Sequence, residues 1–490
     1  MRILPYLYEY FKTNYFTLIC AVLIGACFLF RRLSGGRFLG KIPSMRKQLF
    51  WVLAVFCLGT ILRLGWIGIC RYEPAFQWSD ATEKSKNLIE QDGINIYAAS
   101  ITKGSWFRGA EGEPLARRPV GYPTLLGAVY SVFGTHLTAF HVLNFLLYLA
   151  TLPILYALAR EMFDDLTGLL VVFIFSIYPV SVYGMSLALD EHLFVPLWYG
   201  GIWLLIRQAN GSKIKWPLLW YGLIFGCATA TRTHSFFMPL IVGFVYFRLS
   251  RSWKKVLLAA AVVYLIGQAV IFPWIWRNYQ VWGIYVPYTA TNHDVYHGCN
   301  ASVTQADNNG HWPEPGEPGY NETLSKAIAR YDVATFQPLA AREVSHYILT
   351  HPWDVFVTGI EKSLHFLGAN RKTGVWAIDL MEESKHYTPE LKLPEEQRRF
   401  FEELAFGAYY IVFYSFLFGA ISTLKTWKAL PPQRKNTLLI SGLCFAGYLG
   451  LHFLLYPERK YRYPLEPFMM IVASHFLLWA AGMRRPETAA

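Results

Sequence analysis

Charged residues are scarce in this sequence of 490 residues, at 16% against roughly 25% in a typical soluble protein. Hydrophobic residues make up 54% of the chain, and its mean hydropathy is +0.27. The chain therefore lacks the polar side chains with which a soluble enzyme, a coiled coil or a disordered protein covers its surface. These values predict a polytopic membrane protein.

Several sequence signals of soluble function are also missing. None of the seven cysteines forms a CxxC pair, so we expect neither a disulfide framework nor a zinc site. There is no internal repeat, no low-complexity tract and no glycine-rich phosphate loop. A net charge of +12 suggests nucleic-acid binding in a soluble protein. Here we attribute it to basic residues that flank membrane spans on the cytoplasmic side.

Long hydrophobic runs are abundant instead. They lie at 14–30, 49–70, 138–159, 166–186, 191–206, 216–231, 234–249, 255–273, 404–424, 436–456 and 464–483. A further run, 352–368, is interrupted by charged residues, and we interpret 352–403 as a re-entrant or interfacial segment. The first run is followed directly by Arg31 and Arg32, the flank of a retained span and not of a cleaved signal peptide. We expect an all-α membrane bundle with about 11–12 spans.

The charges of the loops predict the orientation of the bundle. Short loops on one side carry an excess of lysine and arginine, which marks the cytoplasmic side: they lie at 31–48, 207–215, 248–255 and 425–435, with Arg484 and Arg485 after the last span. Loop 71–136 has seven basic and seven acidic residues, and loop 274–351 has four basic against seven acidic residues. We expect both long loops outside, the N-terminus outside and the C-terminus inside. The protein is then an integral protein of the inner or plasma membrane.

Residues 1–490 are interpreted as one membrane unit in which two long loops, 71–136 and 274–351, carry the chemistry. Loops on a rigid scaffold frequently hold catalytic residues, whereas transporters usually have short loops and a site at the midplane of the membrane. The organisation therefore favours an enzyme that works on its outer membrane face. A transporter or flippase of lipid-linked sugars, or an assembly protein of a surface polymer, remains the alternative.

Asp80 is the candidate catalytic base. It lies in the sequence Trp78-Ser79-Asp80-Ala81-Thr82-Glu83, one or two helical turns beyond the span that ends near 70. A carboxylate in this position can accept a proton from an acceptor hydroxyl. The alternative interpretation is a helix N-cap, because Ser79 or Asp80 followed by Glu83 also fits a capping box.

Two further segments of the outer face carry candidate binding residues. Arg118 and Tyr122 lie in the sequence Arg-Arg-Pro-Val-Gly-Tyr-Pro that precedes a short apolar run at 124–134, typical of an interfacial helix. Arg118 either binds phosphate or reaches the lipid headgroups. Asp190 and Glu191 begin another span, where adjacent acids are costly unless they are exposed or paired, which favours a functional role.

Basic residues at three separate points of the outer face depart from the general charge pattern. They are Arg232, Arg277 next to Asn278, and Lys460 with Arg462. Their guanidinium groups can converge on one phosphate through bidentate hydrogen bonds. The alternative is that each binds a lipid headgroup. His293, Asp294 and His297 lack a third well-spaced ligand, so no metal site is expected.

In this order, the motifs resemble those of the GT-C membrane glycosyltransferases over roughly residues 50–480. The bacterial branch, similar to dolichyl-phosphate-mannose–protein mannosyltransferases and to the lipid A aminoarabinose transferase, is the nearest match. The corresponding elements are Asp80, Pro119–Pro123, Phe133–Asn144, Tyr178-Pro179 with Glu191–Phe194, Pro273–Tyr279 with Gly283, and Lys460, Arg462, Pro464 and Pro467. The chain departs from the pattern in the residues after Asp80, in the added span 14–30 and in the doubled acid Asp190-Glu191.

The resemblance implies a mechanism. The donor is a sugar on a polyprenyl phosphate, and the acceptor is a hydroxyl of a glycan, lipid or protein, with no nucleotide cofactor. Arg277, Arg462, Arg232 and Lys460 neutralise the phosphate that leaves. Asp80 deprotonates the acceptor, which attacks with inversion. Tyr122, Asp190, Glu191, Asn278 and Arg118 are then expected to contact the acceptor or the sugar.

Overall fold

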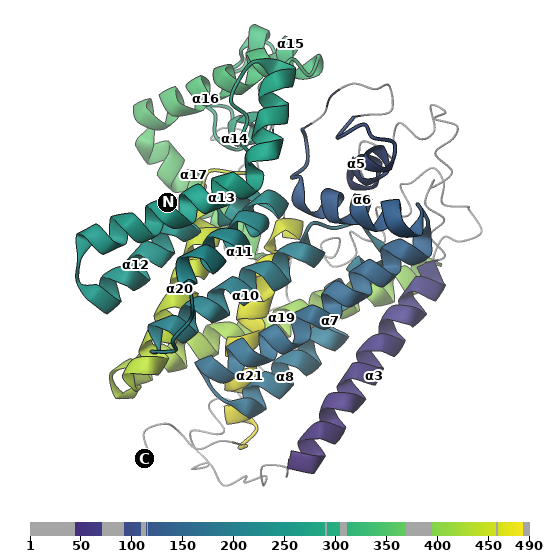
Figure 1. The fold of residues 1–490 in the computed structure, drawn as a ribbon, viewed down its shortest axis with the longest axis vertical. Coiled ribbons are helices and arrows are strands. Elements are labelled where there is room, and N and C mark those ends of the chain that lie inside the picture. The colour runs from purple at the N-terminus through teal and green to yellow at the C-terminus, as the bar shows by residue number, and fades with distance from the viewer. Residues whose placement is uncertain are drawn as a thin grey trace.

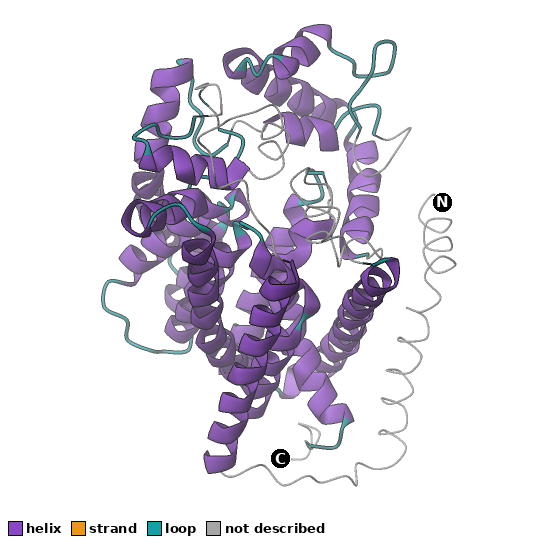
Figure 2. Ribbon diagram, turned by 90° about the vertical axis from the view of Figure 1, so that its right-hand side faces the viewer, coloured by secondary structure: helices purple, strands orange, loops and turns teal. Residues whose placement is uncertain are grey.

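The computed structural model describes residues 45–70, 93–108, 114, 116–289, 292–303, 311–368, 394–456 and 459–483. Within these ranges the protein is helical and contains no strand, as Figure 2 shows; one isolated bridge joins Arg108 and Pro114. The expected all-α membrane fold is therefore confirmed. The expected first span, 14–30, and the loop around Asp80 lie outside the described residues.

The helices follow the hydrophobic runs of the sequence closely. The α-helices are α3 (Met45–Cys70), α5 (Gly93–Thr102), α6 (Gly121–Phe133), α7 (Leu137–Met162), α8 (Asp165–Ile177), α9 (Pro179–Tyr183), α10 (Glu191–Ala209), α11 (Pro217–Thr231), α12 (Met238–Ser250), α13 (Trp253–Trp282), α14 (Asn292–Gly298), α15 (Glu322–Ala329), α16 (Val333–Thr350), α17 (Pro352–Leu367), α19 (Glu395–Thr426), α20 (Pro432–Leu451) and α21 (Glu466–Ala480). Short 3₁₀ helices are η1 (Gly184–Ser186), η2 (Thr233–Ser235), η5 (Trp427–Ala429) and η6 (Arg459–Leu465).

Three of the described helices are long and apolar enough to cross a membrane: Thr138–Met162, Trp253–Trp282 and Glu395–Ala429. A fourth candidate is broken, because Asp165–Ile177 and Pro179–Ser186 meet at a bend of 55°. The break follows from Pro179, which disfavours helical backbone at the preceding Tyr178. The run expected at 166–186 is thus two helices, and the total of about 11–12 spans stays a prediction.

Contacts between distant turns define one end of the bundle, which we call the basic end. Arg434 at the start of α20 donates to the carbonyl of Phe163, which ends α7, over 3.1 Å. Asn210 after α10 donates to Thr437 over 3.0 Å. Arg248 in the last turn of α12 donates to Asn436 over 3.0 Å. The turns α7–α8, α10–α11, α12–α13 and α19–α20 therefore lie together.

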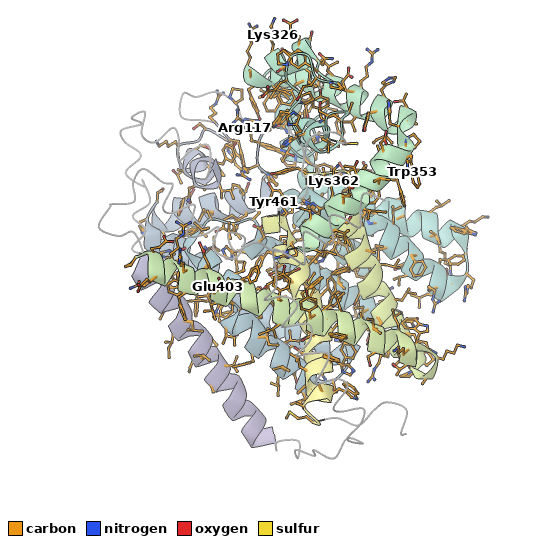
Figure 3. All side chains as sticks on the ribbon, turned by 180° about the vertical axis from the view of Figure 1, so that it is seen from behind. Arg117, Lys326, Trp353, Lys362, Glu403 and Tyr461 are labelled. Atoms are coloured by element: carbon orange, nitrogen blue, oxygen red, sulfur yellow. The ribbon has the colours of Figure 1, made fainter. Side chains whose placement is uncertain are left out.

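The opposite end, which we call the polar end, carries α5, α6 and α14–α17 (Figure 1). Helix α17 packs on α16 and η6. The amine of its Lys362 donates to the carbonyls of Gly298 and Leu454. Figure 3 shows Lys362 and Tyr461 at the junction between this helical layer and the bundle. The segment 352–368 is therefore held at the polar end along its length.

The bundle itself packs like a membrane protein. A Cβ added to Gly226 on α11 would lie 2.8 Å from the Cα of Gly267 on α13, so the two backbones approach closely. Small residues allow such approaches between membrane helices. The opposite face of α13 exposes large apolar side chains, among them Leu265 and Phe272. The core lies around α10 and α21, where Trp198, Tyr199 and Phe468 are buried.

Candidate functional site

An ion pair between Glu191 and Arg232 is buried at the polar end. Glu191 begins α10, and Arg232 ends α11. The guanidinium Nη1 of Arg232 donates to the carboxylate of Glu191, and these side chains are 7% and 8% exposed respectively. Arg232 also lies over the ring of Tyr461, with 5.2 Å from its Cζ to the ring centroid. Glu191 and Arg232, which were predicted from separate sequence motifs, thus form one ion pair.

A second buried ion pair joins Arg462 to Glu466. The Nε of Arg462 donates to Glu466 over 3.0 Å, and both side chains are 3% exposed. Its Nη1 donates to the carbonyl of Phe366 over 3.1 Å and to that of Gly368. Its Cζ lies 3.6 Å from the centroid of the Tyr409 ring. Arg462 therefore connects η6 with α17, α19 and α21.

Two histidines lie between the ion pairs. The ring of His234 in η2 stacks on that of His452, with 5.0 Å between their centroids. His452 in turn stacks on Phe366 at 4.0 Å, and the carbonyl of Phe366 accepts from Arg462. We call the set Glu191, Arg232, His234, His452, Arg462 and Glu466 the polar layer. Four segments supply it: the start of α10, the end of α11 with η2, the residue after α20, and η6 with the start of α21.

The polar layer contains buried nitrogen atoms that have no hydrogen-bond partner among the described residues. They are Nε of Arg232 and both ring nitrogens of His234 and of His452. Buried polar atoms are nearly always paired in folded proteins, so such a group calls for an explanation. Donors in this position can bind the oxygen atoms of an anionic ligand, for which a phosphate is chemically suited.

Arg277 is held by the segment that follows α5. Its Nη2 donates to the carbonyl of Phe107 over 2.8 Å, and its Nη1 donates to Asn278 over 2.9 Å. Asn278 donates to the carbonyl of Val286 over 3.0 Å. Trp274 and Trp282 flank the guanidinium at 5.0 and 5.2 Å. These bonds place Arg277 where α13 meets the segment after α5.

Tyr122 positions the segment that precedes Asp190. Its hydroxyl donates to Asn144 over 2.5 Å, and both residues are completely buried. Asn144 donates to the carbonyl of Leu187 over 3.1 Å. The Tyr122 hydroxyl thus points into the protein, and the bond fixes the backbone that leads into Asp190. Asp190 itself is 7% exposed at the start of α10.

Arg118 is half-buried in the segment that precedes α6. Its neighbour Arg117 lies over the ring of Tyr331, with 4.7 Å from Cζ to the ring centroid. The hydroxyl of Tyr331 accepts from the amide of Ala116 over 2.9 Å. Burial raises the pKa of Tyr331 above its ordinary value, so this tyrosine remains neutral at physiological pH. The tyrosine therefore provides a packed anchor for Arg117.

Two predicted site residues, Asp80 and Lys460, are wholly or partly outside what the structure describes. Asp80 lies outside the described residues, and the same applies to the side chains of His293 and Asp294. Lys460 lies in η6, and its side chain is also outside the description. Within the described part of the chain, no cluster of three His, Cys, Asp or Glu residues is arranged to hold a metal ion.

Four members of the site were not found from the sequence: Glu466, His234, His452 and Tyr409. Glu466 had a signal, because it follows Arg462 by four residues, the spacing of a helical ion pair. The two histidines had none, because each is defined by contacts between segments more than 200 residues apart. Tyr409 similarly stands in an apolar run with many other aromatic residues.

Comparison with known proteins gives one family match. Residues 117–276 match the family model described as dolichyl-phosphate-mannose-protein mannosyltransferase. No curated protein sequence matches the chain significantly. The match covers α6 to α13, and therefore Tyr122, Glu191 and Arg232.

Solved structures from Archaeoglobus fulgidus share a distant similarity. The oligosaccharyltransferase AglB in complex with an inhibitory peptide and a dolichol-phosphate is 12% identical with a TM-score of 0.42, over 89% of this chain and 50% of that one. The apo form of that oligosaccharyltransferase is 12% identical with a TM-score of 0.41, over 88% and 50%. The chain thus spans about half the length of these proteins.

The family match falls on the segment that supplies half of the polar layer, and it agrees with the ordered motifs of the sequence. The resemblance predicted from those motifs is therefore confirmed at the level of the family. The matched residues 117–276 make up about a third of the chain, and over this part the chain is similar to the dolichyl-phosphate-mannose-protein mannosyltransferase family.

Proposed function

We propose that this protein is a glycosyltransferase of the bacterial branch that uses a polyprenyl-phosphate-linked sugar as its donor. It transfers the sugar, with inversion, to a hydroxyl of a glycan, lipid or protein at the outer face of the inner or plasma membrane. The observation that carries the proposal is the polar layer, in which Arg232 and His234 offer unpartnered buried nitrogens beside a second buried arginine, Arg462. The polyprenyl tail then lies in the lipid next to the bundle.

The arginines of the polar layer would stabilise the phosphate that leaves. When the bond from the anomeric carbon to the phosphate oxygen breaks, the phosphate gains negative charge. Preorganised donors at this position lower the barrier because they need no reorganisation during the reaction. Glu191 orients Arg232, and Glu466 orients Arg462. Lys460 adds a further charge from the same short helix, η6.

Asp80 remains our choice for the general base. Glu191 is bonded to Arg232, so its role in this arrangement is to position the guanidinium. Asp190 is buried at the start of α10 behind the segment that Tyr122 and Asn144 fix. Arg277 would contact the phosphate that leaves, whereas Asn278 and Arg118 would contact the acceptor or the sugar. The reaction as proposed needs no metal ion.

The proposal is tested by offering radiolabelled polyprenyl-phosphate sugars to the purified protein with a hydroxyl acceptor. A transferase releases polyprenyl phosphate and labels the acceptor, whereas a flippase moves the lipid intact. Arg232→Lys should slow the transfer about tenfold to a hundredfold, because lysine lacks the planar fork. Arg342→Lys is the matched control, since Arg342 is exposed on α16 and should retain the wild-type rate. Equal rates in both variants would contradict the role of Arg232.

The orientation has its own test. Single cysteines replace exposed lysines in a background without native cysteine, and an impermeant reagent is added to intact cells. Cysteines at Lys103 and at Lys326, which lies at the tip of α15 (Figure 3), should be labelled. A cysteine at Lys213 in the α10–α11 turn should be protected. Labelling of Lys213→Cys with protection of the other two would reverse the orientation.

A further inference from the structure

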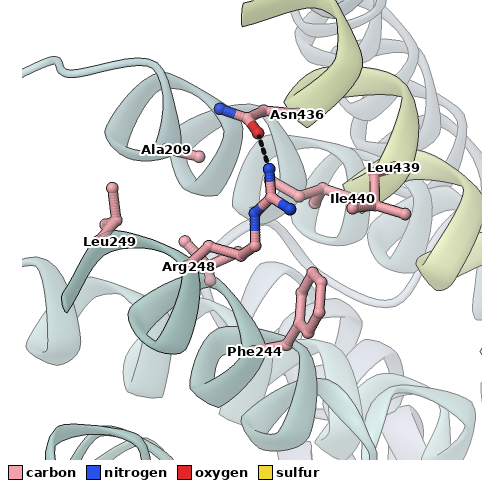
Figure 4. Close-up of a pocket in the computed structure, with 8 residues that line it drawn as sticks. Ala209, Phe244, Arg248, Leu249, Asn436, Leu439 and Ile440 are labelled. Atoms are coloured by element: carbon pink, nitrogen blue, oxygen red, sulfur yellow. Dashed lines mark hydrogen bonds between the residues drawn. The ribbon is translucent and has the colours of Figure 1, made fainter. Parts of the chain in front are cut away.

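A pocket opens between three helices at the basic end, opposite the polar layer (Figure 4). It has a volume of about 80 Å³, which is room for several water-sized groups. It is lined by Ala209 of α10, by Phe244, Val245, Arg248 and Leu249 of α12, and by Asn436, Leu439 and Ile440 of α20. The walls are apolar except for Arg248 and Asn436, so the pocket has one charged group.

The guanidinium of Arg248 is oriented by Asn436. Its Nη2 donates to the side-chain oxygen of Asn436 over 3.0 Å, as Figure 4 shows. Arginine carries five N–H donors, and Asn436 is the hydrogen-bond partner that the described residues provide. The remaining donors of the guanidinium are therefore open to a ligand with several acceptor oxygens, such as a phosphate.

The surroundings of the pocket favour an anion. No acidic residue is among the described residues that line it. Arg251 follows Arg248 in the turn to α13, and Lys254 and Lys255 lie in the first turn of α13. Arg207 and Lys435 stand on the neighbouring helices α10 and α20. Exposed leucines border the same turn, because Leu249 and Leu257 are 50% and 69% exposed. This combination of apolar surface and cations is typical of the headgroup region of a membrane.

We propose that this pocket binds the phosphate of an anionic phospholipid at the basic end of the bundle. The phosphate oxygens accept hydrogen bonds from Arg248, and the acyl chains lie along the exposed apolar side chains of α12 and α13. A bound lipid would connect α10, α12 and α20, the helices whose opposite ends carry Glu191, His234 and His452. The proposal does not depend on the sugar or the acceptor of the reaction.

The test is a titration of the purified protein in a zwitterionic detergent at low ionic strength. The probes are a short-chain phosphatidic acid, the matching phosphatidylcholine, and inorganic phosphate, each measured by calorimetry. We expect saturable binding of the phosphatidic acid and at least tenfold weaker binding of the other two probes. Equal affinity for inorganic phosphate would overturn the lipid as the source of the phosphate.

Three variants then test whether the phosphatidic acid binds in the pocket or is attracted only by the overall positive charge of the basic end. Arg248→Gln should weaken binding of the phosphatidic acid about tenfold, because the charge-assisted hydrogen bonds are lost. Ala209→Leu fills the pocket from α10 without removing a charge and should have a similar effect. Arg251→Gln removes a charge three residues away, where the guanidinium lies over Phe247, and should change affinity less than about twofold.

The melting temperature of each variant in detergent verifies that it is folded. Equal losses in Arg248→Gln and Arg251→Gln would show that the basic end attracts the lipid only through its overall charge. Wild-type affinity in both Arg248→Gln and Ala209→Leu would show that the pocket is not the binding site. In that case Arg248 only extends its side chain towards the headgroups.

Discussion

The two ends of the bundle carry charge in opposite ways. At the polar end, the pairs Glu191–Arg232 and Arg462–Glu466 are at most 8% exposed. At the basic end, Arg160 and Asp165 form a pair over 3.2 Å whose side chains are 62% and 52% exposed. Burial of a charge is costly, whereas an exposed charge in this position costs little and helps to orient the protein. The buried pairs therefore mark the end where function is expected.

Asp80→Asn tests whether the polar end also contains the base, and it should have the largest effect. The asparagine keeps the shape and much of the capping ability of aspartate, but it cannot accept the proton of the acceptor. If Asp80 is the base, turnover should fall roughly 10²–10⁴-fold while the protein stays folded. The measurement is release of polyprenyl phosphate, together with a thermal melt in detergent.

Asp190→Asn is the matched control for that experiment. Asp190 stands at the polar end and is buried at the start of α10. Near-normal turnover in Asp80→Asn, combined with loss of turnover in Asp190→Asn, would move the base to Asp190. Near-normal turnover in both would exclude a carboxylate base at these two positions.

Glu191→Gln tests the cost of the buried ion pair directly, because it leaves Arg232 as a buried charge without its partner. Loss of one member of a buried ion pair typically costs about 3–5 kcal/mol. We expect the free energy of unfolding to fall by this amount, measured by titration with a denaturing detergent. The double variant Glu191→Gln with Arg232→Met should recover part of the loss, since it removes both charges. A single variant as stable as the wild type would show that Arg232 finds another partner.

Arg277→Ala tests whether a half-buried arginine at the polar end contributes as much to transition-state stabilisation as a fully buried one. Arg277 is held by Phe107 and Asn278, and we expect it to touch the donor phosphate in the transition state. Its loss should cost about 2–4 kcal/mol of transition-state stabilisation, read from kcat/KM. Arg277→Lys should recover only part of it. Wild-type kinetics in Arg277→Ala would indicate that Arg277 only connects α13 to the segment after α5.

The sequence predicted the helices better than the site. Hydrophobic runs located α7, α10 and α20 within a few residues, because the thickness of a bilayer dictates their length and composition. It did not predict that Pro179 splits one run into two helices, although proline is a known helix breaker.

Among the site residues, Glu191, Arg232 and Arg462 were identified from their unusual positions, since a charge beside an apolar run is conspicuous. Their partners were missed for a physical reason. A pair such as His234 with His452 exists only through packing between distant helices, and each histidine alone resembles any polar residue at the end of a helix. The direction of the Tyr122 side chain, into Asn144, was similarly not deducible from the motif that contains it.

Asp165→Asn at the basic end should have the smallest effect and so completes the comparison. Asp165 pairs with Arg160 in a solvent-exposed position and accepts from the hydroxyl of Tyr156 over 2.6 Å. Exposed pairs contribute about 0–1 kcal/mol, and an asparagine can still accept the hydrogen bond from Tyr156. We therefore expect a change in the free energy of unfolding below about 1 kcal/mol and an unchanged rate of transfer. A loss as large as that of Glu191→Gln would show that exposure does not separate the two ends, because the exposed pair would then contribute as much as the buried one.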